Sequence, residues 1–350
     1  MTPASLKIGA QNLLINCAEL RRGDSLLIIL EDPELGWYKK DVAEAIIAEA
    51  SELEITVNLI TVPGPTNKPD NDLTRAMADY DCTIFFARIG DQDRFEFNSC
   101  NAKRVMSYAR SAESLASSFG TSHYKGLQEL KRCINSILVS AKVIDIRCPK
   151  GTSIVTQNAK HEFDAIQDVT IRRFPVVVPA PMDASLTSGK VVLDNYLTPT
   201  GSKVYQPESL QISSPVEIYV HNGKIDTIIG DEDVVQSIKR HYMAVAAQFN
   251  LSWETVHSWH AGIHPGVFYN HKPEINPDRW SNTLFASPKF LHFHTCGDYA
   301  PGEICWMIEN PSIFVDGKSL WHDGVLRPEI FDKSKDCLEK WPDLQKLFVG

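Results

Sequence analysis

The sequence lacks the segments that would place it in or on a membrane. Its apolar runs, such as residues 26–30, are far shorter than the roughly 18 residues that a membrane-spanning helix needs. The first residues contain no apolar signal-peptide core. No basic amphipathic stretch favours binding to a membrane surface. These absences predict a cytoplasmic protein with no membrane partner.

The sequence also has too little positive charge for a nucleic-acid-binding surface. Its 350 residues include 35 Lys and Arg against 44 Asp and Glu, a formal net charge of −9. Binding to phosphates needs a basic surface, so we expect no nucleic-acid partner. The 8 cysteines include no Cys-x-x-Cys pair, which argues against a structural zinc site or a disulfide framework.

Two further kinds of motif are missing. No Gly-x-Gly-x-x-Gly and no Gly-x-x-x-x-Gly-Lys-[Ser/Thr] follows a predicted strand, so nucleotide binding has no support. No Gly-x-Ser-x-Gly elbow is present, so a serine hydrolase triad has none either. The chemistry must therefore be sought in other residues.

Residues 1–148 alternate predicted helices with predicted strands. Apolar residues at helical spacing predict helices, and continuous apolar runs predict buried strands. The predicted helices are residues 6–20, 41–52 and 127–141, and the predicted strands are residues 26–30, 55–62, 82–88 and 143–147. This alternation predicts an α/β domain whose sheet is mostly parallel and flanked by helices.

Residues 149–350 have a different sequence pattern, with frequent turn residues and short β runs. Short strands are predicted at residues 175–178, 190–193 and 216–220, a long helix at 233–250, and strands and hairpins over 284–326. Asn222-Gly223 suits a type I′ hairpin turn, and Asp316-Gly317 marks another turn. We therefore predict a second domain, of β-rich α+β class, over residues 149–350.

Histidine is unevenly distributed along the chain. Six of the 11 histidines lie between residues 257 and 294, where a uniform distribution would place about one: His257, His260, His264, His271, His292 and His294. Neutral imidazole is a common ligand of zinc and iron, and it also transfers protons near neutral pH. The cluster therefore indicates a metal site or an acid–base site.

The first histidine segment covers residues 256–266. His260 and His264 are four residues apart and would share one face of a helix, but the nearby glycines and proline favour a helix end or a loop. His260 is a candidate metal ligand, and His257 and His264 are candidate catalytic groups. Structural hydrogen bonds are the alternative role for His257 and His264.

The second segment, residues 290–298, alternates as a strand does. His292 and His294 would then project from one face, with Phe293 on the other. Two imidazoles on one strand face are an unusual choice for a core unless they bind something. Both are candidate metal ligands, and a satisfied pair of buried histidines is the alternative.

The third segment, residues 301–308, also reads as a strand, and Glu303 and Cys305 would share one face. A carboxylate in an apolar strand is costly unless it is paired or ligated, so Glu303 is a candidate metal ligand or general base. The alternative for Glu303 is a surface position on an edge strand. Cys305 is a candidate ligand or a small packed side chain.

These segments resemble the aminopeptidase T-like superfamily, which contains thermophilic leucyl aminopeptidases and ring-cleaving 2,5-dihydroxypyridine 5,6-dioxygenases. Residues 307–317 are similar to the family pattern Met-Ile, two residues, Pro, then Val-Asp-Gly. Residues 260–265 resemble the segment that supplies a histidine ligand in the dioxygenases and a glutamate ligand in the peptidases. Residues 292–297 resemble a metal-binding peptidase segment. The family's His-x-Asp pair is replaced here by Glu303-Ile304-Cys305.

The resemblance implies a metal site and a homodimer or larger assembly, and it leaves three functions open. The first is a mononuclear non-haem Fe(II) ring-cleaving dioxygenase acting on a small hydroxylated (hetero)aromatic. Its metal would be held by His260, Glu303 and either His292 or His294. The second is a metallo-aminopeptidase or amidohydrolase that uses Zn, Co or Mn to activate water. The third is a non-catalytic binding protein, suggested by the loss of the His-x-Asp pair.

Overall fold

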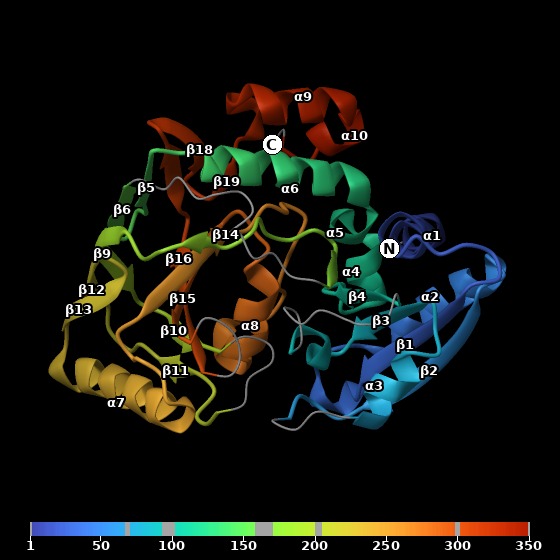
Figure 1. Cartoon of the computed structure of the whole chain (residues 1–350), viewed down its shortest axis with the longest axis horizontal. Helices are drawn as coiled ribbons and strands as arrows, with labels where there is room; N and C mark the ends of the chain where they lie inside the picture. Colours follow the sequence, from blue (N-terminus) through green and yellow to red (C-terminus); the bar gives the residue numbers. More distant parts are fainter. Residues whose placement is uncertain are drawn as a thin grey trace. The chain divides into compact units, whose positions relative to one another are not determined.

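The computed structural model describes residues 2–66, 71–92, 102–157, 171–199, 205–297 and 302–348. It divides into two compact units (Figure 1). Unit 1 comprises Met1–Glu129, Asp168–Val177 and Asp343–Gly350, and unit 2 comprises Leu130–Gln167 and Val178–Pro342. Unit 2 thus begins before the predicted boundary at residue 148, and unit 1 takes in two later segments. Asp298 and Pro301, at the ends of two predicted segments, lie outside the described residues.

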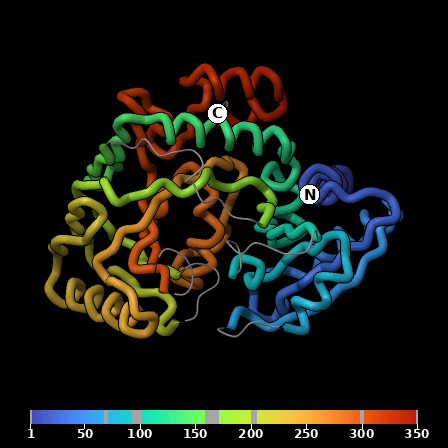
Figure 2. Tube along the Cα trace, in the orientation of Figure 1, coloured from blue at the N-terminus to red at the C-terminus, as the bar shows by residue number. Residues whose placement is uncertain are grey.

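Unit 1 contains a parallel five-stranded sheet in the order β2-β1-β3-β4-β7. Its strands are β1 (Ser25–Glu31), β2 (Thr56–Val62), β3 (Cys82–Phe86), β4 (Lys103–Ser107) and β7 (Arg172–Phe174). The first four are the blue to teal strands of the trace in Figure 2. The side chains of residues 26–29 in β1 have no exposed surface, which explains why this strand is a continuous apolar run.

The helices of unit 1 precede or follow these strands, as in an α/β fold. They are α1 (Pro3–Gln11), the π-helix η1 (Asn12–Cys17), η2 (Pro33–Leu35), α2 (Lys40–Glu52), α3 (Asn71–Met77), η3 (Arg88–Asp91), α4 (Ala112–Ala116) and α5 (Ser118–Thr121). Helix α6 (Tyr124–Val139) begins in unit 1 and ends in unit 2. The predicted α/β class of this part of the chain is confirmed.

Unit 2 contains two antiparallel sheets. The eight-stranded sheet has the order β13-β12-β9-β6-β5-β17-β18-β19, and the six-stranded sheet has the order β11-β10-β16-β15-β14-β8. The strands are β5 (Val143–Arg147), β6 (Ser153–Gln157), β8 (Met182–Asp183), β9 (Thr187–Leu193), β10 (Tyr196–Thr198), β11 (Leu210–Gln211), β12 (Val216–His221), β13 (Lys224–Ile229), β14 (Val256–Ala261), β15 (Phe290–Cys296), β16 (Glu303–Glu309), β17 (Ser312–Val315), β18 (Lys318–His322) and β19 (Val325–Leu326). The predicted β-rich class is confirmed.

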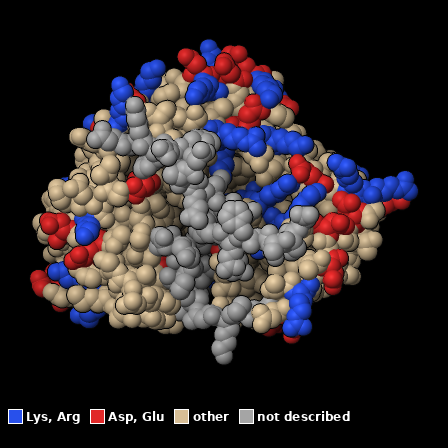
Figure 3. All heavy atoms as spheres, viewed as in Figure 1, with Lys and Arg blue, Asp and Glu red and all other residues tan. Residues whose placement is uncertain are grey.

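The remaining helices lie in the second half of the chain, and all but the last belong to unit 2. They are α7 (Glu232–Phe249), η5 (Pro273–Ile275), α8 (Pro277–Leu284), η6 (Pro328–Ile330), α9 (Asp332–Lys340) and α10 (Pro342–Gln345). Acidic and basic side chains are intermixed over α9, at the top of Figure 3. Among the helices of the described ranges, none is long and apolar enough to cross a membrane.

Both predicted turns have the expected backbone. Asn222 and Gly223 have φ values of 47° and 68°, and Asp316 and Gly317 have values of 47° and 82°. A type I′ turn requires positive φ at both central residues, which Asn, Asp and Gly tolerate. These turns join β12 to β13 and β17 to β18.

One predicted strand is present but lies in another sheet, and a second predicted strand is absent. The strand at residues 143–147 exists as β5, but it pairs antiparallel with β6 and β17 in unit 2 instead of joining the parallel sheet. A tight turn closed by the Cys148–Thr152 backbone bond follows β5, and so short a connection permits only antiparallel pairing. The strand predicted at residues 175–178 is absent, since Pro175 has no N–H to donate to a ladder.

Helix α7 carries a buried histidine that should make stability depend on pH. His241 is 6% exposed, and its Nε2 has no hydrogen-bond partner among the described residues. Burial lowers the pKa of His241 from 6.5 to about 4. In the unfolded chain His241 therefore binds a proton below pH 6.5, whereas in the folded chain it stays neutral down to about pH 4. The contribution of His241 to the free energy of unfolding has its full value above pH 6.5 and decreases as the pH falls from 6.5 toward 4.

We expect the free energy of unfolding to fall between pH 7 and pH 5 by about 2 kcal/mol more in the natural chain than in His241→Phe. Phenylalanine keeps an aromatic ring against Tyr205, whose ring centroid lies 5.9 Å from that of His241. Urea unfolding at the two pH values measures the difference. An equal loss of stability in both proteins would contradict the assignment.

Candidate metal centre

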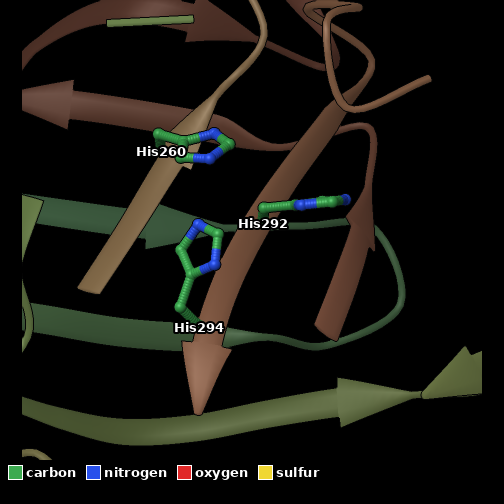
Figure 4. Close-up of side chains that lie close together, drawn as sticks. All are labelled: His260, His292 and His294. Atoms are coloured by element: carbon green, nitrogen blue, oxygen red, sulfur yellow. The ribbon is translucent and has the colours of Figure 1, made fainter. Parts of the chain in front are cut away.

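Three adjacent strands in the middle of the six-stranded sheet carry the predicted metal ligands. In the antiparallel register, His260 of β14 lies opposite His292 of β15. His294 lies opposite Cys305 of β16, and Cys296 lies opposite Glu303. Directly paired residues project from the same face of a sheet. The prediction that His292 and His294 share a face is confirmed, and His260 shares that face with them (Figure 4). By the same register, Glu303 and Cys305 also project from that face.

The opposite face of these strands is apolar and fixes the register. Trp259, Phe293 and Trp306 have no exposed surface there. The indole Nε1 of Trp306 donates to the hydroxyl of Tyr242 on α7 at 2.6 Å, and that hydroxyl lies 2.6 Å from Thr295 Oγ1. A slip of one residue would exchange the imidazoles with these aromatic rings, so packing under α7 determines where the histidines point.

The three histidines form a compact, buried cluster. His260, His292 and His294 are 6%, 6% and 8% exposed, and one ligand nitrogen of each lies within 4.8 Å of the others. The ring centroids of His260 and His294 are 4.8 Å apart. Burial, with a smaller effect of His294, lowers the pKa of His292 well below its usual range. His292 is therefore neutral at pH 7, which is the form that binds metals.

A second group of candidate ligands contains His294, Glu303 and Cys305, whose ligand atoms also lie within 4.8 Å of one another. The Glu303 carboxylate contacts His294 Nδ1, and Cys305 Sγ lies 3.7 Å from the same nitrogen. Nε2 of His294 is buried and has no hydrogen-bond partner among the described residues. A carboxylate on one ring nitrogen fixes the tautomer that presents the other nitrogen to a metal.

The structure thus brings the predicted ligands together in two overlapping groups. His260 and Glu303 belong to different groups, and among the described residues the two groups share His294. The alternative reading of Glu303 as a surface residue on an edge strand is wrong. Its strand β16 pairs on both sides, with β10 and β15, and Glu303 is 1% exposed.

His257 and His264 lie outside both groups. Helical spacing between His260 and His264 does not apply, because residues 256–261 form strand β14 and His264 follows it. His257 Nε2 lies 2.7 Å from the Cys296 carbonyl oxygen, and His264 Nδ1 accepts from the Gly266 N–H at 3.1 Å. Both histidines thus make hydrogen bonds of the structural kind that the sequence analysis named as their alternative role. A catalytic role for either residue stays a prediction.

Helix α8 adds side chains to the site that the sequence analysis missed. Ser281 Oγ lies 3.3 Å from His292 Nε2 and accepts a hydrogen bond from Thr198 Oγ1 at 2.8 Å. Ser281 and Thr198 are fully buried. The pair Asn276-Pro277 is a helix-start signal, since Asn caps the helix and proline suits its first turn. That signal predicts a helix at this position, but it does not predict that a side chain of the helix contacts His292.

Asp278 of α8 is a further buried carboxylate, 2% exposed, that the sequence analysis missed. Its Oδ1 accepts a hydrogen bond from Asn282 Nδ2 at 2.5 Å. Burial, followed by smaller effects of Cys305, Asp278 and Glu303, raises the pKa of Tyr205 well above its usual range. The Tyr205 hydroxyl is therefore protonated and donates to the Glu303 carbonyl oxygen at 2.8 Å.

No protein-family model matches the chain, and no curated protein matches it. Among solved structures, the chain is similar to 2,5-dihydroxypyridine dioxygenase from Pseudomonas putida KT2440, with a TM-score of 0.62 and 13% identity over 95% of this chain and 99% of that one. It also matches wild-type AmpT from Thermus thermophilus, with a TM-score of 0.48 and 11% identity over 92% and 99% of the two chains. The first match establishes a shared fold, so the resemblance expected from the sequence is confirmed at the level of the fold.

Proposed function

We propose that this chain is a metal-dependent enzyme for a small-molecule substrate, with one metal ion held by His260, His292 and His294. The observation that carries the proposal is the convergence of three buried imidazoles whose ligand nitrogens lie within 4.8 Å of one another. Three protein ligands leave further coordination positions for water or substrate, as catalytic sites require.

The surrounding residues have positioning roles in this proposal. Glu303 holds His294 through Nδ1, so that the buried Nε2 faces the metal position. Ser281, held by Thr198, contacts His292 Nε2 and orients that ring. Phe285 packs against His260 and His292, with ring centroids 6.1 and 5.9 Å away, and excludes water from that side.

We propose Fe(II) as the metal and ring cleavage of a small hydroxylated (hetero)aromatic as the reaction. Imidazole is a ligand of iron, and open coordination positions are what a non-haem Fe(II) oxygenase needs for substrate and O₂. The fold shared with a 2,5-dihydroxypyridine dioxygenase adds support for this substrate class. When bound, the iron would supply coordination positions for the substrate hydroxyl groups and for O₂. The protein supplies the aromatic ring of Phe285 beside His260 and His292.

A metallo-aminopeptidase or amidohydrolase is the second candidate. Three histidines also form catalytic zinc sites, where the metal lowers the pKa of a bound water to about 7. The buried carboxylate of Glu303, which contacts His294, favours this reading, because it is a candidate base for that water. Zinc, cobalt or manganese would then replace iron.

Metal analysis of protein purified without oxygen and without chelator tests both candidates. We expect about one iron per chain, and O₂ uptake with hydroxylated pyridines or phenols. Zinc, cobalt or manganese, with release of free amine from peptides or amides in the absence of O₂, would replace the oxygenase by the hydrolase. Failure to retain any divalent metal, even after reconstitution, would overturn both and leave the non-catalytic binding protein.

We also propose a cytoplasmic homodimer or larger homo-oligomer. The family resemblance of residues 260–265, 292–297 and 307–317 supports the assembly. Sedimentation equilibrium of the purified chain tests the assembly, and a monomer across micromolar concentrations would contradict it.

A further inference from the structure

A second candidate binding site lies in unit 1, at the carboxyl ends of its parallel strands. Strand β1 is the first strand of the sheet in the sequence. Strand β2 pairs with it on one side, and β3, followed by β4, lies on its other side. The order of the strands therefore reverses between β1 and β3. In open parallel sheets, ligands bind outside the carboxyl ends of the strands at such a switch point. Here β1 ends at Glu31, and Arg88 follows β3.

Glu31 and Arg88 form a buried ion pair at this switch point. Glu31 has no exposed surface and Arg88 is 5% exposed. Nη2 of Arg88 donates to Glu31 Oε1 at 2.6 Å, and Nε donates to the same oxygen at 2.9 Å. The backbone N–H of Arg88 donates to Oε2 at 2.9 Å. The carboxylate is therefore fully compensated by the backbone N–H and one edge of the guanidinium.

The other edge of the guanidinium is unused. Nη1 of Arg88 is buried and has no hydrogen-bond partner among the described residues. A guanidinium carries five N–H donors, and two of them belong to this nitrogen. Leaving charged donors buried and unsatisfied costs free energy, so a native site normally supplies an acceptor for them.

A second arginine lies on the same aromatic ring. The guanidinium carbon of Arg88 is 4.0 Å from the ring centroid of Trp37, and that of Arg110, which follows β4, is 4.8 Å from it. Arg110 is 7% exposed and Trp37 is 3% exposed. Contact with an indole face stabilises each cation, and it also holds both guanidinium planes in place. A negative group on the same rim, Asp91, accepts from the Tyr108 hydroxyl at 2.9 Å.

We propose that unit 1 binds a small oxyanion, a carboxylate or a phosphate, at this switch point. Arg88 Nη1 donates hydrogen bonds to the oxyanion, and Arg110 supplies a second positive charge. A purely structural ion pair explains the contact between Glu31 and Arg88, but it explains neither the unused Nη1 donors nor the second arginine on Trp37. Guanidinium groups bind carboxylates and phosphates through paired hydrogen bonds, which matches both ligand classes.

The test is a titration of the full chain with inorganic phosphate or with acetate at constant ionic strength. Scanning calorimetry measures Tm at each anion concentration. The titrations use the His294→Ala variant as well as the natural chain, so that binding to the histidine cluster is not mistaken for binding at Arg88. We expect a saturable rise of Tm in both proteins, because a ligand that binds only the folded state stabilises it. Success with one anion alone would identify the ligand class.

Arg88→Lys and Arg110→Gln locate the site. Lysine in place of Arg88 keeps the positive charge beside Glu31 but lacks the planar fork, and glutamine in place of Arg110 removes the second positive charge. Each change should therefore weaken anion binding about tenfold or more. Arg22→Gln is the matched control, because Arg22 is an exposed arginine of unit 1 that pairs with Glu54. The proposal is overturned if neither anion gives a saturable shift of Tm, or if Arg110→Gln leaves the anion affinity unchanged. Both results remain decisive even if Arg88→Lys does not fold.

Discussion

His294→Ala should lower the metal affinity of this protein by about 100-fold or more. Among the described residues, His294 is the member shared by both groups of convergent ligand atoms, so its loss breaks either donor set. The remaining histidines cannot close the site, because they lie on their own strands in a fixed register. Metal content after dialysis against metal-free buffer, and competition with a chromogenic chelator, measure the effect.

Two further variants decide which group binds the metal. If the three histidines are the ligands, His260→Ala should lose metal as fully as His294→Ala does, and Cys305→Ser should retain it. The opposite pattern would place the metal between His294, Glu303 and Cys305. His221→Ala is the control, since His221 is exposed at the end of β12. Full metal retention in His294→Ala would refute the proposed site.

Glu303→Gln should weaken metal binding by about 10-fold to 100-fold without abolishing it. The amide has the size of the carboxylate but lacks its charge, so it holds His294 Nδ1 less firmly and makes that ring a weaker ligand. Chelator competition gives the affinity, and circular dichroism shows whether the fold is retained. Glu309→Gln is the matched control, because Glu309 ends the same strand half-exposed and pairs with Lys150.

The size of the Glu303→Gln effect separates its two candidate roles. A loss of metal as complete as in His294→Ala would make Glu303 a direct ligand. Unchanged metal affinity, with loss of turnover alone, would make it a general base in the reaction and not a partner of His294. Either result would correct the positioning role proposed here.

Local patterns in the sequence were enough to predict many elements, although strands β4 and β7 of the parallel sheet were missed. The apolar run of β1 predicts a strand buried on both faces, and the Asn-Gly and Asp-Gly pairs predict hairpin turns, because these features depend on neighbouring residues. Period-two alternation similarly predicts that His292 and His294 share a face. The same reasoning misplaced β5, since a strand's own residues do not state whether its partner is parallel or antiparallel.

The candidate centre needed information that no single segment contains. His260 precedes His292 by 32 residues in the chain, and only the pairing of β14 with β15 places the two rings side by side. That register depends on the packing of Trp259, Phe293 and Trp306 on the other face of the sheet. Ser281 reaches His292 from a separate helix.

The two fold classes, the turns and the residue types suited to metal binding could be predicted from the sequence, because these follow from local periodicity and side-chain chemistry. Tertiary structure alone decided that Glu303 contacts His294 and that Arg88 and Arg110 share the face of Trp37. Such contacts arise from long-range packing, in which distant strands align so that their apolar faces are buried together.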